Sequence, residues 1–186
     1  MGGWMHGSTH GLTHSWMGCA AVVAALFSVA GAGDARAQEI PPPAVALMLG
    51  LSQYDLSGTG TESTVALRID LPMSDYLYAE PGFAYMRYDT DGGASITHLT
   101  AEVQLQGSYP FGRWRPYLGA GAGGFFDLRK QRGGADFVEP TISGAGGVRV
   151  ALVSDLGARA ELRVRGIGRH FGGSAAEWSA GAFWSF

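Results

Sequence analysis

Two histidines, His98 and His170, are the residues from which a catalytic site could be built, because histidine is the usual general base near neutral pH. Ser174 and Glu177 follow His170, so a nucleophile, a base and an acid lie close together in the sequence. Such sets often occur by chance in loops, and no phosphate loop, nucleotide motif or metal-ligand spacing accompanies them. The sequence therefore predicts no enzymatic activity, no cofactor and no metal, and an activity based on His170 remains a less favoured alternative.

Arginine and carboxylate side chains recur at every second position in several segments. Residues two apart lie on the same face of a strand, so each series places its charges on one face. These faces carry Arg68, Asp70, Glu80, Glu102, Glu139, Arg149, Arg159, Glu161, Arg163 and Arg165. The near balance of sign favours a buried interior in which arginines fork onto carboxylates.

The predicted interior charged network consists of Arg68, Glu80, Glu102, Arg149, Glu161, Arg163 and Arg165. We expect this network to fill the interior of the fold, and a narrow gated pore, in which pairs exchange partners, is the alternative. Arg163 and Arg165 are successive on one face, so one of the two could instead face the rim or water.

Apolar residues occupy the positions between the charges, and this period of two predicts strands. The predicted strands span residues 44–54, 64–71, 76–88, 98–109, 115–128, 138–153, 158–168 and 178–186. Short turns alternate with longer loops, which is typical of an all-β, eight-stranded antiparallel up-and-down barrel. Pro81 cannot donate to a ladder, so it predicts a bulge or kink in its strand.

Alternation alone does not say which face of the barrel points inward. A soluble barrel, such as a lipocalin, would turn its apolar face inward. The balanced charged face and the aromatic last strand instead favour a transmembrane barrel with its apolar face toward lipid. We expect Tyr76, Tyr109, Trp114, Trp184 and Phe186 at the inner membrane interface, and Tyr54, Tyr88 and Trp178 at the outer one.

The first 37 residues predict a cleavable signal peptide. The apolar run 20–30 is too short to span a membrane, and Ala35-Arg-Ala37 is a small-x-small cleavage pattern. Residues 38–43 would then form a short periplasmic lead-in to a transmembrane barrel over 44–186. The one cysteine, Cys19, lies in the leader, which excludes thiol chemistry from the mature chain. A net charge of −3 excludes a basic nucleic-acid-binding protein.

Two stretches resemble small barrels of the OmpA-like outer-membrane superfamily: Tyr109-Pro-Phe-Gly-Arg-Trp-Arg-Pro-Tyr-Leu-Gly-Ala-Gly-Ala-Gly123 and the terminal Ala182-Phe-Trp-Ser-Phe186. The resemblance covers about residues 44–186. It implies a monomer in the outer membrane, in contact with outer-membrane lipids and lipopolysaccharide. It also implies that Trp184 and Phe186 belong to the signal read by the insertion machinery. Because the chain ends at Phe186, we expect no peptidoglycan-binding domain.

Cations near the predicted outer strand ends could contact lipopolysaccharide phosphates, because the arginine fork matches phosphate geometry. They are Arg87, Arg129, Lys130, Arg132 and Arg169, and ordinary solvated loop charge is the alternative. The predicted role is therefore structural or surface-interaction, with a polar plugged interior. A narrow channel for ions or small solutes is the alternative. A lipid A-modifying enzyme comes third, since the His-x-Ser pattern that we associate with lipid A deacylases is absent.

Overall fold

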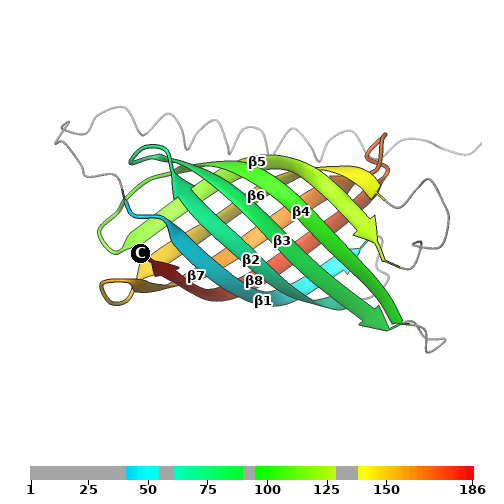
Figure 1. Ribbon diagram of the computed structural model, residues 1–186, viewed down its shortest axis with the longest axis horizontal. Coiled ribbons are helices and arrows are strands. Elements are labelled where there is room, and N and C mark those ends of the chain that lie inside the picture. The colour runs from blue at the N-terminus through cyan, green and yellow to red at the C-terminus, as the bar shows by residue number, and fades with distance from the viewer. Residues whose placement is uncertain (1–40, 55–60, 90–94, 129–137) are drawn as a thin grey trace, which may run out of the picture. The chain divides into compact units, whose positions relative to one another are not determined.

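Eight antiparallel strands close into a barrel in the computed structural model of the protein (Figure 1). The structure describes residues 41–54, 61–89, 95–128 and 138–186. The strands are β1 (Ala44–Tyr54), β2 (Thr61–Pro72), β3 (Leu77–Asp89), β4 (Ser95–Ser108), β5 (Trp114–Asp127), β6 (Val138–Ala151), β7 (Leu156–Ile167) and β8 (Gly173–Ser185). Each strand pairs with its neighbours in the chain and β8 pairs with β1, so the sheet has no open edge. The predicted all-β, up-and-down barrel is confirmed.

No helix in the described ranges is long and apolar enough to cross a membrane. The predicted signal peptide and the first residues of the lead-in lie outside the described residues.

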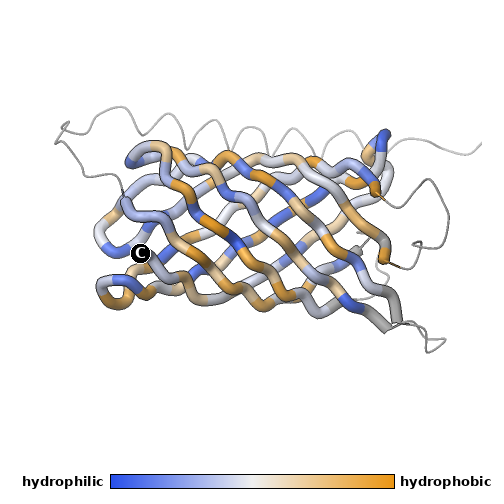
Figure 2. Tube along the Cα trace, viewed as in Figure 1, coloured by the Kyte–Doolittle hydropathy of each residue, from blue (hydrophilic) through white to orange (hydrophobic). Residues whose placement is uncertain are grey.

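The barrel carries apolar side chains on its outside and charged side chains inside, and Figure 2 shows the alternation of hydropathy along the strands. Leu49 is 61% exposed and Val103 is 59% exposed, whereas Arg68 and Glu80 are each 1% exposed. A soluble barrel would have the opposite arrangement. The apolar outer face is the surface that a bilayer requires, because lipid hydrocarbon cannot solvate charged side chains.

The two ends of the barrel differ in their connections. Short turns join β2 to β3, β4 to β5 and β6 to β7 at one end, which we call the inner end. The carboxyl terminus lies at this end as well (Figure 1), where the Phe186 amide donates to the Pro43 carbonyl over 3.1 Å. The other four connections lie at the opposite end, the outer end, and three of them fall at least partly outside the described residues.

Exposed aromatic side chains gather at the inner end, as predicted. They are Tyr76, Tyr109, Trp114, Trp184 and Phe186, and the Tyr76 and Tyr109 rings stack with centroids 6.2 Å apart. Trp178 was predicted at the outer interface, and this is wrong. It lies near the middle of β8, opposite Leu51 of β1 and Leu162 of β7. The side chains of Tyr54 and Tyr88 lie outside the described residues.

Strand β8 begins at Gly173, whereas the sequence predicted a start at residue 178. The additional residues pair on both sides, with Gly173 opposite Ile167 of β7 and Ala175 opposite Tyr54 of β1. Their small side chains gave no apolar alternation in the sequence. The longer strand carries Glu177 into the barrel, where its side chain is fully buried.

Pro81 interrupts one ladder without inserting a residue. The register between β2 and β3 is the same on both sides of the interruption, with Arg68 opposite Gly82 and Leu71 opposite Ala79. On the other side of β3, Pro81 pairs in register with Val103. A bulge or kink was predicted at Pro81. The bulge is wrong, because no residue is inserted and the missing proline amide interrupts only the pairing with β2.

Candidate functional site

The interior of the barrel is the candidate site, because ten of the described charged side chains are buried there and their signs cancel. The arginines are Arg68, Arg149, Arg159, Arg163 and Arg165, and the carboxylates are Asp70, Glu80, Glu102, Glu161 and Glu177. All seven residues of the predicted network are among them. Asp70 and Arg159 were placed on the charged face by their spacing but not in the network, and Glu177 was assigned to a loop.

The outer part of the network is an arginine held between two glutamates. Arg165 donates from Nε to Glu102 over 3.0 Å and from Nη1 to Glu177 over 2.8 Å. Glu177 also accepts from Nη2 of Arg68 over 3.1 Å. Carboxylates of β4 and β8 therefore bind arginines of β2 and β7. The Glu102–Arg165 contact joins β4 to β7, which are not neighbours in the barrel, so it crosses the interior.

Arg163 is the hub of the central part. Its guanidinium lies 2.7 Å from Glu80, 2.9 Å from Glu161 and 3.1 Å from Glu102, measured between nitrogen and oxygen. These acids come from β3, β7 and β4. Arg163 and Arg165 are each 1% exposed, so the prediction that one of them could face the rim or water is wrong.

The inner part is organised around Asp70. Arg149 forks onto its carboxylate with two hydrogen bonds of 2.8 Å, and Nη1 of Arg159 adds a contact of 3.2 Å. Tyr117 packs its ring against these guanidiniums, 4.2 Å from that of Arg149. The Tyr117 hydroxyl accepts from Arg159 over 2.8 Å and donates to Glu161 over 2.7 Å. A phenol thus connects the inner and central parts.

Glycines on β5 and β6 make the space that these long side chains occupy. A Cβ on Gly147 would lie 2.5 Å from the Tyr117 hydroxyl, and one on Gly121 would lie 2.5 Å from Cγ of Gln104. An eight-stranded barrel has an interior just wide enough to be filled by side chains. The alternating glycines of β5, which the sequence linked to the family, are therefore part of how this interior is filled.

Apolar side chains cover the outer side of the network. Met86, Phe125, Ile167 and Ala175 form a buried cluster, and each lies close to the outer end of its strand. His98 is 8% exposed and its ring is 4.7 Å from that of Phe125. The cluster separates the Arg165–Glu177 pair from the outer end of the barrel.

The loop triad suggested by the sequence is not assembled. Glu177 is buried inside the barrel on Arg68 and Arg165, whereas His170 is exposed. Ser174 and Glu177 are three positions apart on β8, so their side chains leave opposite faces of the strand. Chemistry based on His170 would need another acid.

Of the predicted rim cations, Arg87 and Arg169 are exposed near the outer end of the barrel. Arg129, Lys130 and Arg132 lie outside the described residues. The structure therefore places two of the five predicted rim cations on the outer rim.

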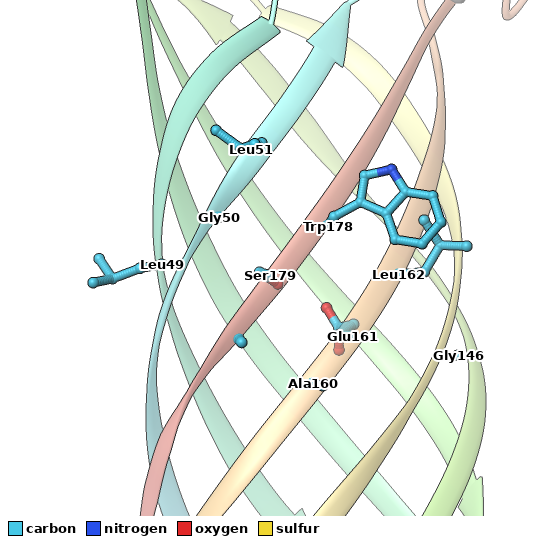
Figure 3. A pocket seen from close by; sticks show the side chains of 10 residues that line it. Leu49, Gly50, Leu51, Gly146, Ala160, Glu161, Leu162, Trp178 and Ser179 are labelled. Carbon is cyan, nitrogen blue, oxygen red and sulfur yellow. The ribbon is translucent and has the colours of Figure 1, made fainter.

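A shallow apolar groove of about 490 Å³ lies on the outside of the barrel, across β1, β8 and β7 (Figure 3). Leu49 and Leu51 border one side and Trp178 and Leu162 the other, with Ser179 between them (Figure 3). The carboxylate of Glu161, whose backbone reaches the groove, belongs to the interior network. The groove is thus part of the lipid-facing surface and offers no reactive group.

Comparison with known proteins identifies the fold. The model of the family described as outer membrane protein beta-barrel domain matches residues 19–186. No curated protein matches the sequence. Three similar solved structures are neisserial surface protein A (NspA), the attachment invasion locus protein Ail of Yersinia pestis and the outer membrane enzyme PagL.

The likeness to these three structures is one of fold. NspA is 16% identical, with a TM-score of 0.64 over 80% of this chain and 100% of that one. Ail is 10% identical, with a TM-score of 0.55 over 80% of this chain and 100% of that one. PagL is 14% identical, with a TM-score of 0.52 over 77% of this chain and 99% of that one.

Proposed function

Since the chain belongs to the outer membrane protein beta-barrel domain family and is an outer-membrane barrel, we propose that it is a closed barrel with a structural and surface-interaction role. The observation that carries the proposal is the filling of the interior. In the described part of the barrel, five arginines and five carboxylates occupy it, and the apolar cluster of Met86, Phe125, Ile167 and Ala175 covers them on the outer side. A permeating ion would have to break buried ion pairs and cross an apolar layer, and both steps are costly.

Single-channel recording tests whether the barrel conducts. The protein is refolded in detergent, folding is verified by the gel shift between unboiled and boiled samples, and the protein is then inserted into a planar bilayer. A silent bilayer after verified insertion is the expected result. Discrete, reproducible openings would overturn the proposal in favour of the narrow channel, and their ion selectivity would report the sign of the charge at the narrowest point.

The outer rim is the part of the barrel that we propose for surface contact. Arg169 is exposed beside the turn between β7 and β8, and Arg87 is exposed on β3, so both can present guanidinium groups to lipopolysaccharide phosphates. The names of two similar structures, a surface protein and an attachment protein, support a role at the cell surface.

A binding assay with purified lipopolysaccharide tests this contact. We expect Arg169→Gln to weaken the binding of the refolded barrel to lipopolysaccharide in uncharged micelles, and Arg169→Gln combined with Arg87→Gln to weaken it further. Arg113→Gln removes an exposed arginine at the inner end and serves as the control. Equal losses in all variants would show that only net charge matters.

We also propose that the protein is not an enzyme. One similar structure, PagL, is an enzyme, so the test is release of acyl chains from added lipid A. We expect no release above that of a boiled sample. Release that His170→Ala abolishes would overturn this proposal.

A further inference from the structure

The inner mouth of the barrel contains an arginine that lies outside the balanced network. Arg115, on β5, is half-buried and lies at an inward-facing position two residues before the buried Tyr117. Its guanidinium lies over the ring of Tyr78, 5.7 Å from the centroid, and Nη1 donates to the Tyr78 hydroxyl. Among the described residues, Arg115 makes no ion pair with a carboxylate.

The neighbour of Arg115 across the ladder is another arginine. Arg115 and Arg149 are directly opposite each other on β5 and β6, and like charges in that position repel. The Arg149 guanidinium lies over the same Tyr78 ring, 5.2 Å from its centroid. The two cations are thus held at one aromatic ring, where an anion would relieve their repulsion.

One donor nitrogen of the Arg149 guanidinium is also without an acceptor among the described residues. Its Nε and Nη2 are occupied by Asp70, and Nη2 also by Gln106, but the buried Nη1 has no acceptor among the described residues. A buried donor without an acceptor is unfavourable, because it has given up its hydrogen bonds to water without replacing them. Arg149 is 5% exposed and Arg115 is half-buried, so Arg115 is the more accessible of the two.

The charges of the network do not supply the missing acceptor. Among the described residues, the five buried carboxylates already face five buried arginines, so the network leaves no carboxylate for Arg115. The carboxylate whose charge acts on Arg115 is that of Asp75, in the turn between β2 and β3. One oxygen of Asp75 is buried without a hydrogen-bond donor, so Asp75 is the internal group that would compete with an added anion.

We propose that the inner mouth is a binding site for a single oxyanion group, a phosphate or a carboxylate, held by Arg115 and by Nη1 of Arg149 beside Tyr78. The site is separate from the outer rim and does not depend on what the loops bind. The guanidinium fork fits planar or tetrahedral oxyanions with paired hydrogen bonds. The inner end is the periplasmic end in barrels of this type, so the ligand group would come from the periplasm or from the lipid headgroups of the inner leaflet.

Titration with inorganic phosphate tests the site. The refolded barrel in uncharged micelles is titrated in a calorimeter, and each variant is first checked by its gel shift. We expect Arg115→Gln to weaken phosphate binding by about tenfold or more, since charge-assisted hydrogen bonds are lost. The matched control is Arg113→Gln, which removes the same charge two residues before Arg115. The Arg113 side chain is exposed and donates to the Leu152 carbonyl.

A second variant gives an effect of opposite sign. Asp75→Asn removes the competing carboxylate, so we expect phosphate to bind more tightly than to the unmodified protein. Equal weakening by Arg115→Gln and Arg113→Gln, or no measurable phosphate binding, would overturn the proposal. Weaker phosphate binding by the Asp75→Asn variant would overturn it as well.

Micelles doped with an anionic phospholipid distinguish a lipid headgroup from a soluble anion as the natural ligand. Loss of phosphate binding there assigns the site to a lipid headgroup, and unchanged binding assigns it to a soluble anion.

Discussion

Arg163 shows how much the interior depends on single side chains. It contacts three carboxylates from three strands, and no other arginine in the described part of the barrel contacts the same three. Replacing it would leave Glu80, Glu102 and Glu161 buried with fewer partners. A buried carboxylate without its partner is far more costly than an exposed one, because the interior cannot solvate its charge.

We therefore expect Arg163→Ala to lower the free energy of unfolding by about 3–5 kcal/mol. Glu102→Ala should have a similar effect, since Glu102 pairs with Arg163 and Arg165. The measurement is the urea unfolding midpoint of the refolded barrel in detergent, followed by tryptophan fluorescence. Arg169→Ala, at an exposed position, is the control and should leave the midpoint unchanged. Unchanged midpoints for both interior variants would contradict a paired interior.

The sequence predicted which residues belong to the network better than it predicted which of them pair with each other. Spacing alone placed Arg159, Glu161, Arg163 and Arg165 on one face, because β7 alternates over its whole length. Spacing could not show that Arg149 of β6 pairs with Asp70 of β2, since that contact crosses the barrel. Tyr117 was likewise missed, because an aromatic residue in a glycine-rich strand carries no sign of a buried ion partner.

Glycines of β6 divide into those that face the interior and those that face lipid. A Cβ on Gly147 would lie 2.4 Å from the Ala160 carbonyl oxygen and 2.5 Å from the Tyr117 hydroxyl. A Cβ on Gly144, three residues earlier, would have its nearest neighbour at 4.0 Å. Of these two glycines, only Gly147 is required by the packing, because the neighbouring strand and the phenol occupy its side-chain space.

Gly147→Ala should therefore destabilise the barrel by about 1–3 kcal/mol, the usual cost of overpacking an interior. The change also displaces the Tyr117 hydroxyl from Arg159 and Glu161, so the effect should shrink when Tyr117 is already replaced by alanine. Gly144→Ala on the same strand is the control, and thermal unfolding detected by the gel shift is the measurement. Equal effects of the two substitutions would show that glycine in β6 is needed for its backbone freedom and not for space.

The strand boundaries that the sequence missed depend on pairing between strands. The first residues of β8 are Gly173, Ser174, Ala175 and Ala176, which look like a loop because none is large and apolar. They are strand residues because β1 and β7 extend beside them. The predicted bulge at Pro81 failed for a related reason, since β4 pairs through Pro81 and holds β3 in register. Both errors arise because strand pairing depends on the adjacent strands, whose residues are not part of the segment being interpreted.

The barrel as a whole isolates a neutral set of charges from solvent. Apolar residues face outward along the strands, and the cluster around Phe125 covers the outer side. At the inner side, Arg115 and Arg149 lie over the ring of Tyr78. Mobile ions screen exposed charges at a distance of about 10 Å in 0.1 M salt and about 3 Å in 1 M salt. Buried pairs are screened much less, because mobile ions do not enter between them.

The stability of the barrel should therefore be nearly independent of salt. We expect the urea midpoint of the protein in uncharged micelles to change little between 0.1 M and 1 M sodium chloride. Lipopolysaccharide binding by the exposed rim arginines should fall steeply over the same range, because those charges are open to solvent. The contrast is informative because both readouts come from one preparation. A midpoint that drops with salt as steeply as lipopolysaccharide binding would mean that ions reach the interior, and the closed barrel would have to be replaced by a water-filled one.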